Sequence, residues 1–428
     1  MTANPNPQSL WAATAPPGPE APALEEHLRT DVAVIGGGYT GLSAALHLAE
    51  DGRNVVVLES NDVGFGGSGR NVGLVNSGLW LSPEEIAQRL GAETGRRLGE
   101  ALRDAPRLVF DLIARHGIDC EATHRGTLTL AHSARALGTL RQRAAQLKRL
   151  GVEVTILERK EAAQRTGTDR YHGALRDPAA GTVQPLGYAR GLARAAVNAG
   201  ARLYCGSPVR ELRRAGGAWE LQTPAGSVTA DAVIQATNAY TDGLWPGLRE
   251  SIIPVYFFQL ASEPLGERGA EILPGAEGAA DTKPVLASVR KDAAGRLIVG
   301  TLGNGDSSGV TILRRWAERF TGGLFPRLGR VRWEYAWTGR FAFTPLHVPA
   351  IHELAPGLIT CIGYNGRGIG PGTVMGKALA EHLSGGEAAL PLPPTPLRPL
   401  AAPGWRGGAY EAGIQSYHLG QLLRLMPL

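Results

Sequence analysis

A strand, a glycine turn and a helix follow one another near the start of the chain, in the run DVAVIGGGYTGLSAALHLA that begins at Asp31. The residues before the glycines have the pattern of a buried strand, and those after them have the apolar spacing of a helix. Gly36 permits a tight turn, Gly38 lets an anion approach the backbone, and Gly41 allows helix and strand to pack closely. The sequence therefore predicts that the pyrophosphate of a dinucleotide lies on the N-terminus of this helix.

An acidic residue ends the next strand, where a nucleotide ribose is expected. The apolar run Val55–Leu58 leads into Glu59, 23 residues after Gly36, and an acid at this place accepts hydrogen bonds from ribose hydroxyls. The alternative is a glycine-rich turn that binds nothing, because 58 glycines in 428 residues produce such spacings by chance. The complete order of strand, turn, helix, second strand and acid favours an adenine-dinucleotide site, with Tyr39 and Thr40 also in contact with the cofactor.

The composition limits the class of protein. A chain of 428 residues exceeds the roughly 250–300 residues at which a single core stops growing, so two domains are expected. The net charge is +5, but no block of Lys and Arg indicates nucleic acid, and an anionic cofactor and substrate are simpler partners. No run of 18 apolar residues predicts a transmembrane segment, and no signal pattern begins the chain, which favours a cytoplasmic location.

Cysteines and histidines give no sign of a disulfide framework or a metal site. Cys120, Cys205 and Cys361 are odd in number and far apart, so we expect small buried side chains. His347 and His352 have no third ligand nearby in the sequence, and metal binding is not expected.

Two further glycine-rich segments accompany the first turn. Gly64–Gly73 follows the acidic strand end and is too long for a simple turn, and such a permissive backbone can approach a ligand closely. Near the C-terminus, glycines again separate a strand, Leu358–Gly363, from a helix, Thr373–Leu383. That helix N-terminus could stabilise negative charge on a reduced flavin, although an ordinary left-handed turn is the alternative.

Taken together, these features resemble the FAD-dependent D-amino-acid oxidase superfamily over nearly the whole chain. One branch of it, which holds γ-glutamylputrescine oxidase, glycine and sarcosine oxidases and bacterial L-pipecolate oxidase, is similar at four further segments. These are Ser68-Gly69-Arg70-Asn71, Ala236-Thr237-Asn238-Ala239-Tyr240, Tyr335-Ala336-Trp337-Thr338-Gly339 and Gly376-Lys377. The stretch Ser68–Trp80 is most similar to L-pipecolate oxidase.

The resemblance implies an α/β (α+β) fold in which a Rossmann-like FAD-binding domain is interleaved with an antiparallel-sheet substrate domain. The FAD-binding domain is expected at residues 26–80, 176–245 and 340–390, and the substrate domain at residues 81–175 and 246–339. Residues 1–25 are expected to form a surface arm with Trp11 as its bulky anchor, and residues 391–428 a C-terminal tail.

The chemistry that the resemblance implies belongs to the flavin: its N5 takes a hydride from the carbon next to a neutral amine, which leaves an imine. Sarcosine oxidases tether the flavin through a cysteine near the C-terminal turn. Gly363–Gly372 contains none, so FAD is expected to be noncovalent. Those enzymes also carry a lysine that assists oxygen, and Leu297–Leu302 offers none, which leaves both O2 and an electron carrier as possible acceptors. The expected cofactor contacts are Gly36, Gly38, Tyr39, Thr40, Gly41, Glu59, Ser68, Arg70, Asn71, Val209, Gly363, Arg367, Gly368 and Ile369.

Two arginines are candidates for holding a substrate carboxylate, because a planar guanidinium pairs with it through two hydrogen bonds. Arg340 follows Trp337-Thr338-Gly339 much as the carboxylate arginine of glycine oxidases follows its own Trp-x-Gly, but it comes one residue earlier. Because side chains alternate along a strand, a shift of one residue turns the side chain to the opposite face. Arg367 lies in the flavin-proximal turn, where it could serve the substrate or the flavin, or simply lie at the surface. The residues expected to wall an apolar pocket are Tyr256, Gln259, Trp337 and Tyr364.

The resemblance makes L-pipecolate the best substrate hypothesis, with Δ1-piperideine-6-carboxylate of lysine degradation as the product and hydrogen peroxide formed from O2. The alternatives are a γ-glutamylputrescine oxidase of putrescine catabolism and a flavin dehydrogenase that uses a quinone or carrier. A catalytically silent nucleotide-binding module would have no need for the second glycine turn.

Overall fold

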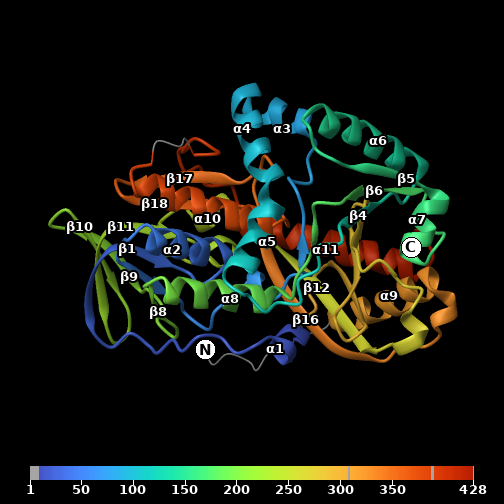
Figure 1. Ribbon diagram of the computed structural model, residues 1–428, viewed down its shortest axis with the longest axis horizontal. Coiled ribbons are helices and arrows are strands. Elements are labelled where there is room, and N and C mark those ends of the chain that lie inside the picture. Colours follow the sequence, from blue (N-terminus) through green and yellow to red (C-terminus); the bar gives the residue numbers. More distant parts are fainter. Residues whose placement is uncertain (1–8, 307–308, 387–389, 428) are drawn as a thin grey trace.

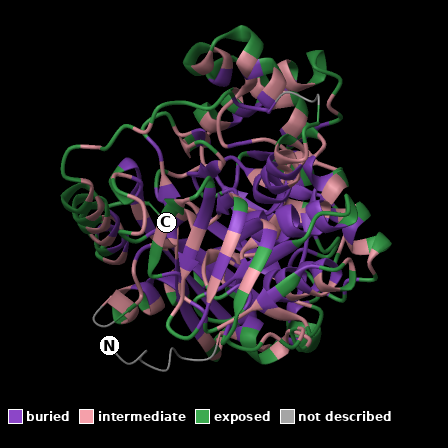
Figure 2. Ribbon diagram, turned by 90° about the vertical axis from the view of Figure 1, so that its left-hand side faces the viewer, coloured by how far each residue is buried: buried purple, intermediate pink, exposed green. Residues whose placement is uncertain are grey.

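Two large sheets lie side by side, one in the left half of Figure 1 and the other in the right half. The structure is a computed structural model that describes residues 9–306, 309–386 and 390–427. Helices cover both sheets, and Figure 2 shows the buried residues concentrated in the strands and in the helices packed on them. None of the helices in the described ranges is long and apolar enough to cross a membrane.

The first sheet is built around a parallel core. Its order is β17-β18-β11-β1-β2-β8, with β10 and β9 added beside β11, and the pairs from β18 through to β8 are parallel. The strands β1 and β2 are apolar and buried where they pair, as expected for parallel strands covered by helices on both faces. The strand bounds are β1 His27–Ile35, β2 Val55–Leu58, β8 Arg202–Tyr204, β9 Glu211–Ala215, β10 Ala218–Gln222, β11 Ser227–Gln235, β17 Ala350–Ala355 and β18 Leu358–Ile362.

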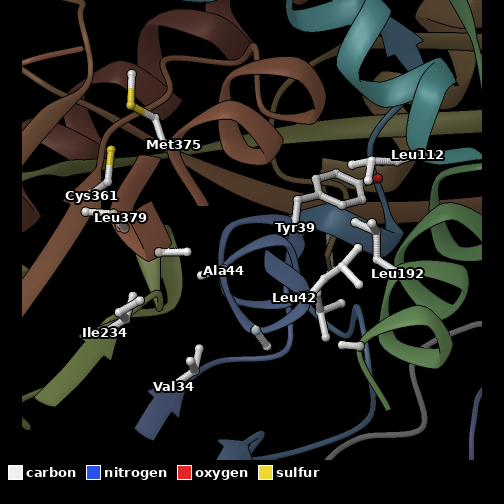
Figure 3. Close-up of a cluster of buried hydrophobic side chains, with 14 of the residues drawn as sticks. Val34, Tyr39, Leu42, Ala44, Leu112, Leu192, Ile234, Cys361, Met375 and Leu379 are labelled. Carbon is white, nitrogen blue, oxygen red and sulfur yellow. The ribbon is translucent and has the colours of Figure 1, made fainter. Parts of the chain in front are cut away.

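One helix of the first unit, α2 (Tyr39–Glu50), packs against α8 (Pro185–Asn198) and α10 (Ile369–Leu383). Figure 3 shows side chains of α2 between those of the strands and of the neighbouring helices. Small residues let α2 and α10 approach closely: a Cβ atom on Gly376 would collide with the carbonyl oxygen of Thr40. This packing fixes the N-terminus of α2 at the end of β1, where the glycine turn lies.

The second sheet is antiparallel except for one pair, β13 with β4. Its order is β16-β12-β15-β14-β13-β4-β6-β5, and α9 (Gly309–Leu324) and α11 (Pro403–Leu422) pack together beside β12. The strand bounds are β4 Thr127–Leu130, β5 Thr155–Glu158, β6 Gly173–Asp177, β12 Ile253–Pro264, β13 Gly278–Asp281, β14 Ala287–Lys291, β15 Arg296–Leu302 and β16 Trp333–Phe343.

The remaining regular elements lie around these two sheets. The helices α3 (Pro83–Leu90), α4 (Ala92–Arg103) and α5 (Ala105–Arg115) are separate, since Gly91 has a φ of 82° and Pro106 lies in the first turn of the third of them. The others are α1 Leu10–Thr14, α6 Ala134–Arg149, α7 Arg159–Thr166 and the two-stranded pair β3 Leu74–Val75 with β7 Gly181–Thr182.

The α/β fold expected from the sequence is confirmed, whereas two details differ from the expected domain bounds. The strands β6 and β16 run across the expected boundaries at 175/176 and 339/340. The helices α4 and α5 pack on α10 of the first unit, although residues 81–175 were expected in the substrate domain. Within the N-terminal arm, Trp11, the expected anchor, is fully buried. It belongs to a buried cluster with Leu186 of α8 and with Ala261, Ile298 and Trp337 of the second sheet.

Substitutions at two helical glycines test the close packing of α2 and α10. In Gly376→Ala, the new methyl group meets the α2 backbone, so we expect a loss of about 1–3 kcal/mol and a lower melting temperature. In Gly99→Ala, in α4, nothing lies within 4 Å of the new atom, and better helix propensity should raise stability by about 0.5–1 kcal/mol. Equal melting temperatures for the two variants would contradict this packing.

Candidate active site

The glycine turn forms one end of a deep pocket. Gly38 caps α2 in an extended conformation, and a Cβ atom on it would lie 2.9 Å from the hydroxyl of Ser68. That hydroxyl accepts a hydrogen bond from the backbone N–H of Tyr39 at 3.1 Å. The first N–H groups of a helix lack partners within it, so this end of α2 suits an anion such as a pyrophosphate.

Glu59 lies at the same end and is almost fully buried. One carboxylate oxygen accepts from the N–H of Gly37 at 2.7 Å, and the other accepts from the N–H of Asn61 at 2.9 Å. These bonds fix the carboxylate beside the turn, at the pocket wall. Each oxygen can accept a further bond, so the acid remains able to meet a ribose hydroxyl.

The pocket has a volume of about 470 Å³, within the usual range of roughly 300–1,000 Å³ for small-molecule sites. It runs from the glycine turn past the loop Gly64–Ser68 to β12, β16 and the C-terminal turn before α10. Most residues that the sequence singled out line it: Gly36, Gly38, Tyr39, Thr40, Glu59, Ser68, Asn71, Val209, Gln259, Arg340, Tyr364, Arg367, Gly368 and Ile369.

Two glycines of the expected cofactor set, Gly41 and Gly363, lie outside the lining. A Cβ atom on Gly41 would collide with the carbonyl oxygen of Gly36, and one on Gly363, whose φ is 83°, would collide with Thr344. Gly41 thus lets α2 pack closely on the end of β1, and Gly363 lets the segment after β18 pass close to Thr344, which follows β16.

Three expected side chains also lie outside the lining. Arg70 donates from Nε to the carbonyl of Phe65 at 2.8 Å and from Nη1 to that of Thr338 at 3.1 Å. Trp337 is buried against Trp11, with ring centroids 5.8 Å apart. Tyr256 is half-buried and pairs with Arg340 across β12 and β16. Arg70 and Trp337 thus act on the architecture around the pocket rather than on its surface.

Arg367, in the C-terminal turn before α10, is a buried positive charge on the pocket wall. It donates from Nη1 to the carbonyl of Ser77 at 2.7 Å, and its guanidinium lies 4.3 Å from the ring centroid of Trp80. Its Nε has no hydrogen-bond partner, and within the described residues no acid pairs with it. Burial, together with the neighbouring charge of Arg143, lowers the pKa of Arg367 to about 9, so an anion that entered the pocket would be stabilised there.

The side chains of Arg143 and Trp80, which sequence reasoning missed, hold this part of the wall. Arg143, on α6, donates to the carbonyls of Leu79 and Trp80 at 2.6 and 2.7 Å. Burial lowers its pKa as well. Arg143 and Arg367 therefore both hold the segment around Trp80. No local pattern could have linked residues 63 positions apart.

Arg340 faces the pocket from β16. Its guanidinium lies 4.3 Å from the ring centroid of Tyr240, and its Nε is buried without a partner. The backbone N–H of Arg340 donates to the hydroxyl of Tyr240 at 3.3 Å. Tyr240 lines the pocket too, and burial raises its pKa. Tyr240 belongs to the segment Ala236–Tyr240, one of those on which the family resemblance rests. No role was predicted for the tyrosine itself.

Two further lining residues, Tyr364 and Gln259, carry polar groups that differ in their hydrogen bonding. The hydroxyl of Tyr364 lies 2.7 Å from that of Thr40, which ties the C-terminal turn to α2; burial raises its pKa well above the usual value. The amide oxygen of Gln259 is buried and has no partner within the described part of the chain. Its capacity to accept a hydrogen bond is therefore unused within the described residues.

An aromatic row along the pocket was not expected from the sequence. Phe257 stacks on Phe341 at 6.3 Å, and Phe341 meets Phe343 edge-on at 5.1 Å. All three line the pocket. Phe341 and Phe343 are two residues apart on β16 and so face the same side, a period-two signal that the sequence does contain. The row gives the substrate end an apolar wall.

Acids are sparse on the pocket wall. Of its described lining residues, only Glu59 and the exposed Asp242 are acidic, and none is a lysine. The described residues include no group of three or more His, Cys, Asp or Glu side chains that could hold a metal ion, and Cys120, Cys205 and Cys361 are free thiols. The wall thus combines an anion site, apolar rings and two arginines.

Comparisons with known proteins agree with this arrangement. Residues 31–382 match the family model described as FAD dependent oxidoreductase (DAO). The chain is 34% identical over 407 residues to a probable oxidoreductase OrdL of Rhizobium meliloti, covering 94% of this chain and 92% of that one. It is 34% identical to the gamma-glutamylputrescine oxidoreductase of Escherichia coli, covering 88% and 89%. Glycine oxidase from Geobacillus kaustophilus has a similar structure, with a TM-score of 0.71 at 24% identity, covering 88% and 100%.

FAD should be held without a covalent bond. The cysteine nearest to the C-terminal turn, Cys361, is buried, and burial raises its pKa to about 12, so it is not a thiolate that could attack a flavin. Acid precipitation of the purified protein should therefore leave the yellow colour in the supernatant. Colour that remains in the pellet would contradict the expectation.

Closing the space beside Gly38 should abolish cofactor binding. In Gly38→Val, the side chain would press on Ser68 and occupy the place of the pyrophosphate. We expect folded but colourless protein, measured as the ratio of flavin to protein absorbance together with circular dichroism. A normal FAD content in this variant would place the pyrophosphate elsewhere.

Proposed function

This chain belongs to the DAO family of FAD-dependent oxidoreductases, and from that premise we propose that it oxidises a small amine that carries a carboxylate. The observation that carries the proposal is the pair Arg340 and Arg367, which line one pocket with the dinucleotide turn and make no ion pair within the described residues. Arg367 is buried, and a buried charge is costly until an anion neutralises it. A substrate carboxylate supplies that anion.

The chain's own residues bind and orient the substrate. FAD, when bound, accepts the hydride from the carbon beside the neutral amine. Arg340 and Arg367 hold the carboxylate, Gln259 offers an amide oxygen to the amine N–H, and the aromatic row excludes water from the apolar part of the substrate. We assign no general base, because the only acids of the described lining are Glu59, beside the turn, and the exposed Asp242.

Between the two candidate substrates, we propose L-pipecolate first. It is a ring with one carboxylate, and the pocket offers an apolar wall with arginines. γ-Glutamylputrescine is the second candidate, since the relative with 34% identity is a gamma-glutamylputrescine oxidoreductase. That substrate carries an additional α-ammonium group, for which an acid would be the natural partner. The scarcity of acids in the described lining supports the first candidate.

The electron acceptor is proposed to be O2, with a quinone or protein carrier as the alternative. In favour of the alternative, no lysine occurs in the described lining. Peroxide released in air during turnover supports O2, whereas turnover that requires an added dye or quinone supports a carrier.

A cytoplasmic location also stays a prediction.

Removal of the arginines tests the proposed function. We expect at least one of Arg340→Met and Arg367→Met to lower kcat/KM for the amino acid by roughly 30-fold to several-thousand-fold, about 2–5 kcal/mol, while FAD content is kept. The matching lysine variant should recover only part of the loss, because an ammonium lacks the two-pronged geometry.

An amine of similar shape without a carboxylate is the control, and its kcat/KM should fall much less. If both methionine variants keep more than about a tenth of the wild-type kcat/KM for the amino acid, a loss below roughly 1.4 kcal/mol, neither arginine anchors the substrate.

Substrate ranking is a separate measurement. Steady-state kinetics on wild-type protein should give a higher kcat/KM for L-pipecolate than for γ-glutamylputrescine, since only the second brings an unpaired ammonium into the pocket. The reverse order would make γ-glutamylputrescine the substrate and would leave the arginine argument untouched.

A further inference from the structure

The loop that lines the middle of the pocket is held from behind by buried side chains. Four successive backbone carbonyls, those of residues 70–73, each accept a hydrogen bond from a distant side chain. The donors come from three separate parts of the chain: the N-terminal arm, β14 and β16. The carbonyl oxygens point toward these donors. Three residues of the same loop line the pocket: Ser68, Asn71 and Val72.

Trp11 is the donor from the N-terminal arm. Its indole Nε1–H donates to the carbonyl of Asn71 at 2.9 Å, and its ring is fully buried. The amide of Gln184 donates to the backbone carbonyl of Trp11 at 2.9 Å, which fixes the arm itself. The arm therefore reaches the back of the pocket wall across 60 positions of sequence.

Trp337 and Arg290 complete the set. Trp337 donates from its indole to the carbonyl of Arg70 at 2.8 Å and packs edge-on against Trp11. Arg290 is buried and donates from Nη1 to the carbonyls of Val72 and Gly73 at 3.1 and 3.2 Å. Its guanidinium lies 5.4 Å from the Trp11 ring centroid. Because these donors are buried, water cannot replace a lost hydrogen-bond partner, so each bond is costly to break.

The loop connects the two ends of the pocket. At one end, Ser68 contacts the dinucleotide turn through its bond from Tyr39. Toward the substrate end, a Cβ atom on Gly67 would lie 2.9 Å from the carbonyl oxygen of Arg340. A shift of this loop would therefore change the wall that runs between the nucleotide turn and the proposed carboxylate site.

We propose that Trp11, with Trp337 and Arg290, forms a positioning cluster that sets the loop 68–73 against bound FAD, so that the N-terminal arm is part of the flavin site. This inference rests on the part of the proposed function that puts FAD in this pocket and is independent of the amine. None of the three side chains lines the pocket. They act on the cofactor through the backbone that they hold.

The test uses the holoenzyme of Trp11→Phe, which keeps an aromatic ring but loses the indole donor. One hydrogen bond to a buried carbonyl corresponds to roughly three- to tenfold in an equilibrium constant. We expect FAD to leave the variant about three- to tenfold faster than wild type, measured by the rise of free-flavin fluorescence after dilution. The visible circular dichroism of the bound flavin should change as well, because its surroundings move.

Trp219→Phe is the matched control. Trp219 is buried in the first sheet, does not line the pocket, and donates its indole N–H to the carbonyl of Pro356 at 3.3 Å. It loses the same kind of bond, so its melting temperature should fall in a similar way. Its FAD release rate and flavin spectrum should remain those of wild type.

Trp337→Phe provides a second test should Trp11→Phe fail to fold, and it should change the same two readouts in the same direction. The inference is overturned if either folded variant releases FAD within twofold of wild type and keeps the wild-type flavin dichroism. Wild-type protein that binds no FAD would instead refute the proposed function, so the two failures are distinguishable.

Discussion

The close contact between the start of α2 and the end of β1 is the constraint on which the site depends. Neither Gly36 nor Gly41 can carry a side chain there, because a Cβ atom on either would meet the backbone of a neighbouring segment. The contact turns the N–H groups at the helix terminus toward the pocket, where they favour an anion. The C-terminal turn is fixed to the same helix through Tyr364 and Thr40, so that the nucleotide site and the substrate wall share one rigid element.

Negative and positive side chains lie on different parts of the pocket wall. Glu59 lies beside the glycine turn, whereas Arg340 and Arg367 lie on the wall formed by β16 and the C-terminal turn. Neither arginine forms an ion pair within the described chain, which supports the proposal that this end of the pocket takes a negatively charged group. The rings of Phe257, Phe341 and Phe343 on the pocket wall lower the local polarity, which strengthens any charge-assisted bond made there.

Sequence reasoning correctly predicted the strand, turn and helix that form one end of the candidate site, because their arrangement depends on local backbone geometry. The spacing of Gly36 and Gly41 and the acid Glu59 is set within one strand-turn-helix-strand unit, so the pattern alone revealed it. The bonds from Arg143 to Leu79 and Trp80 join segments that only the fold brings together, and no local signal marks them. For the same reason Trp337 was expected on the pocket wall: the alternation along β16 could not reveal that Trp11 covers it.

Binding of a carboxylate that cannot react tests most directly the claim that the pocket joins a flavin site to an anion site. Cyclohexanecarboxylate resembles L-pipecolate but has no amine, and its titration into the holoenzyme can be followed in the visible absorbance of the flavin. The account predicts a saturable spectral change with this acid and a much weaker response to the neutral cyclohexanecarboxamide. No change with the acid, or an equal response to the carboxamide, would contradict it.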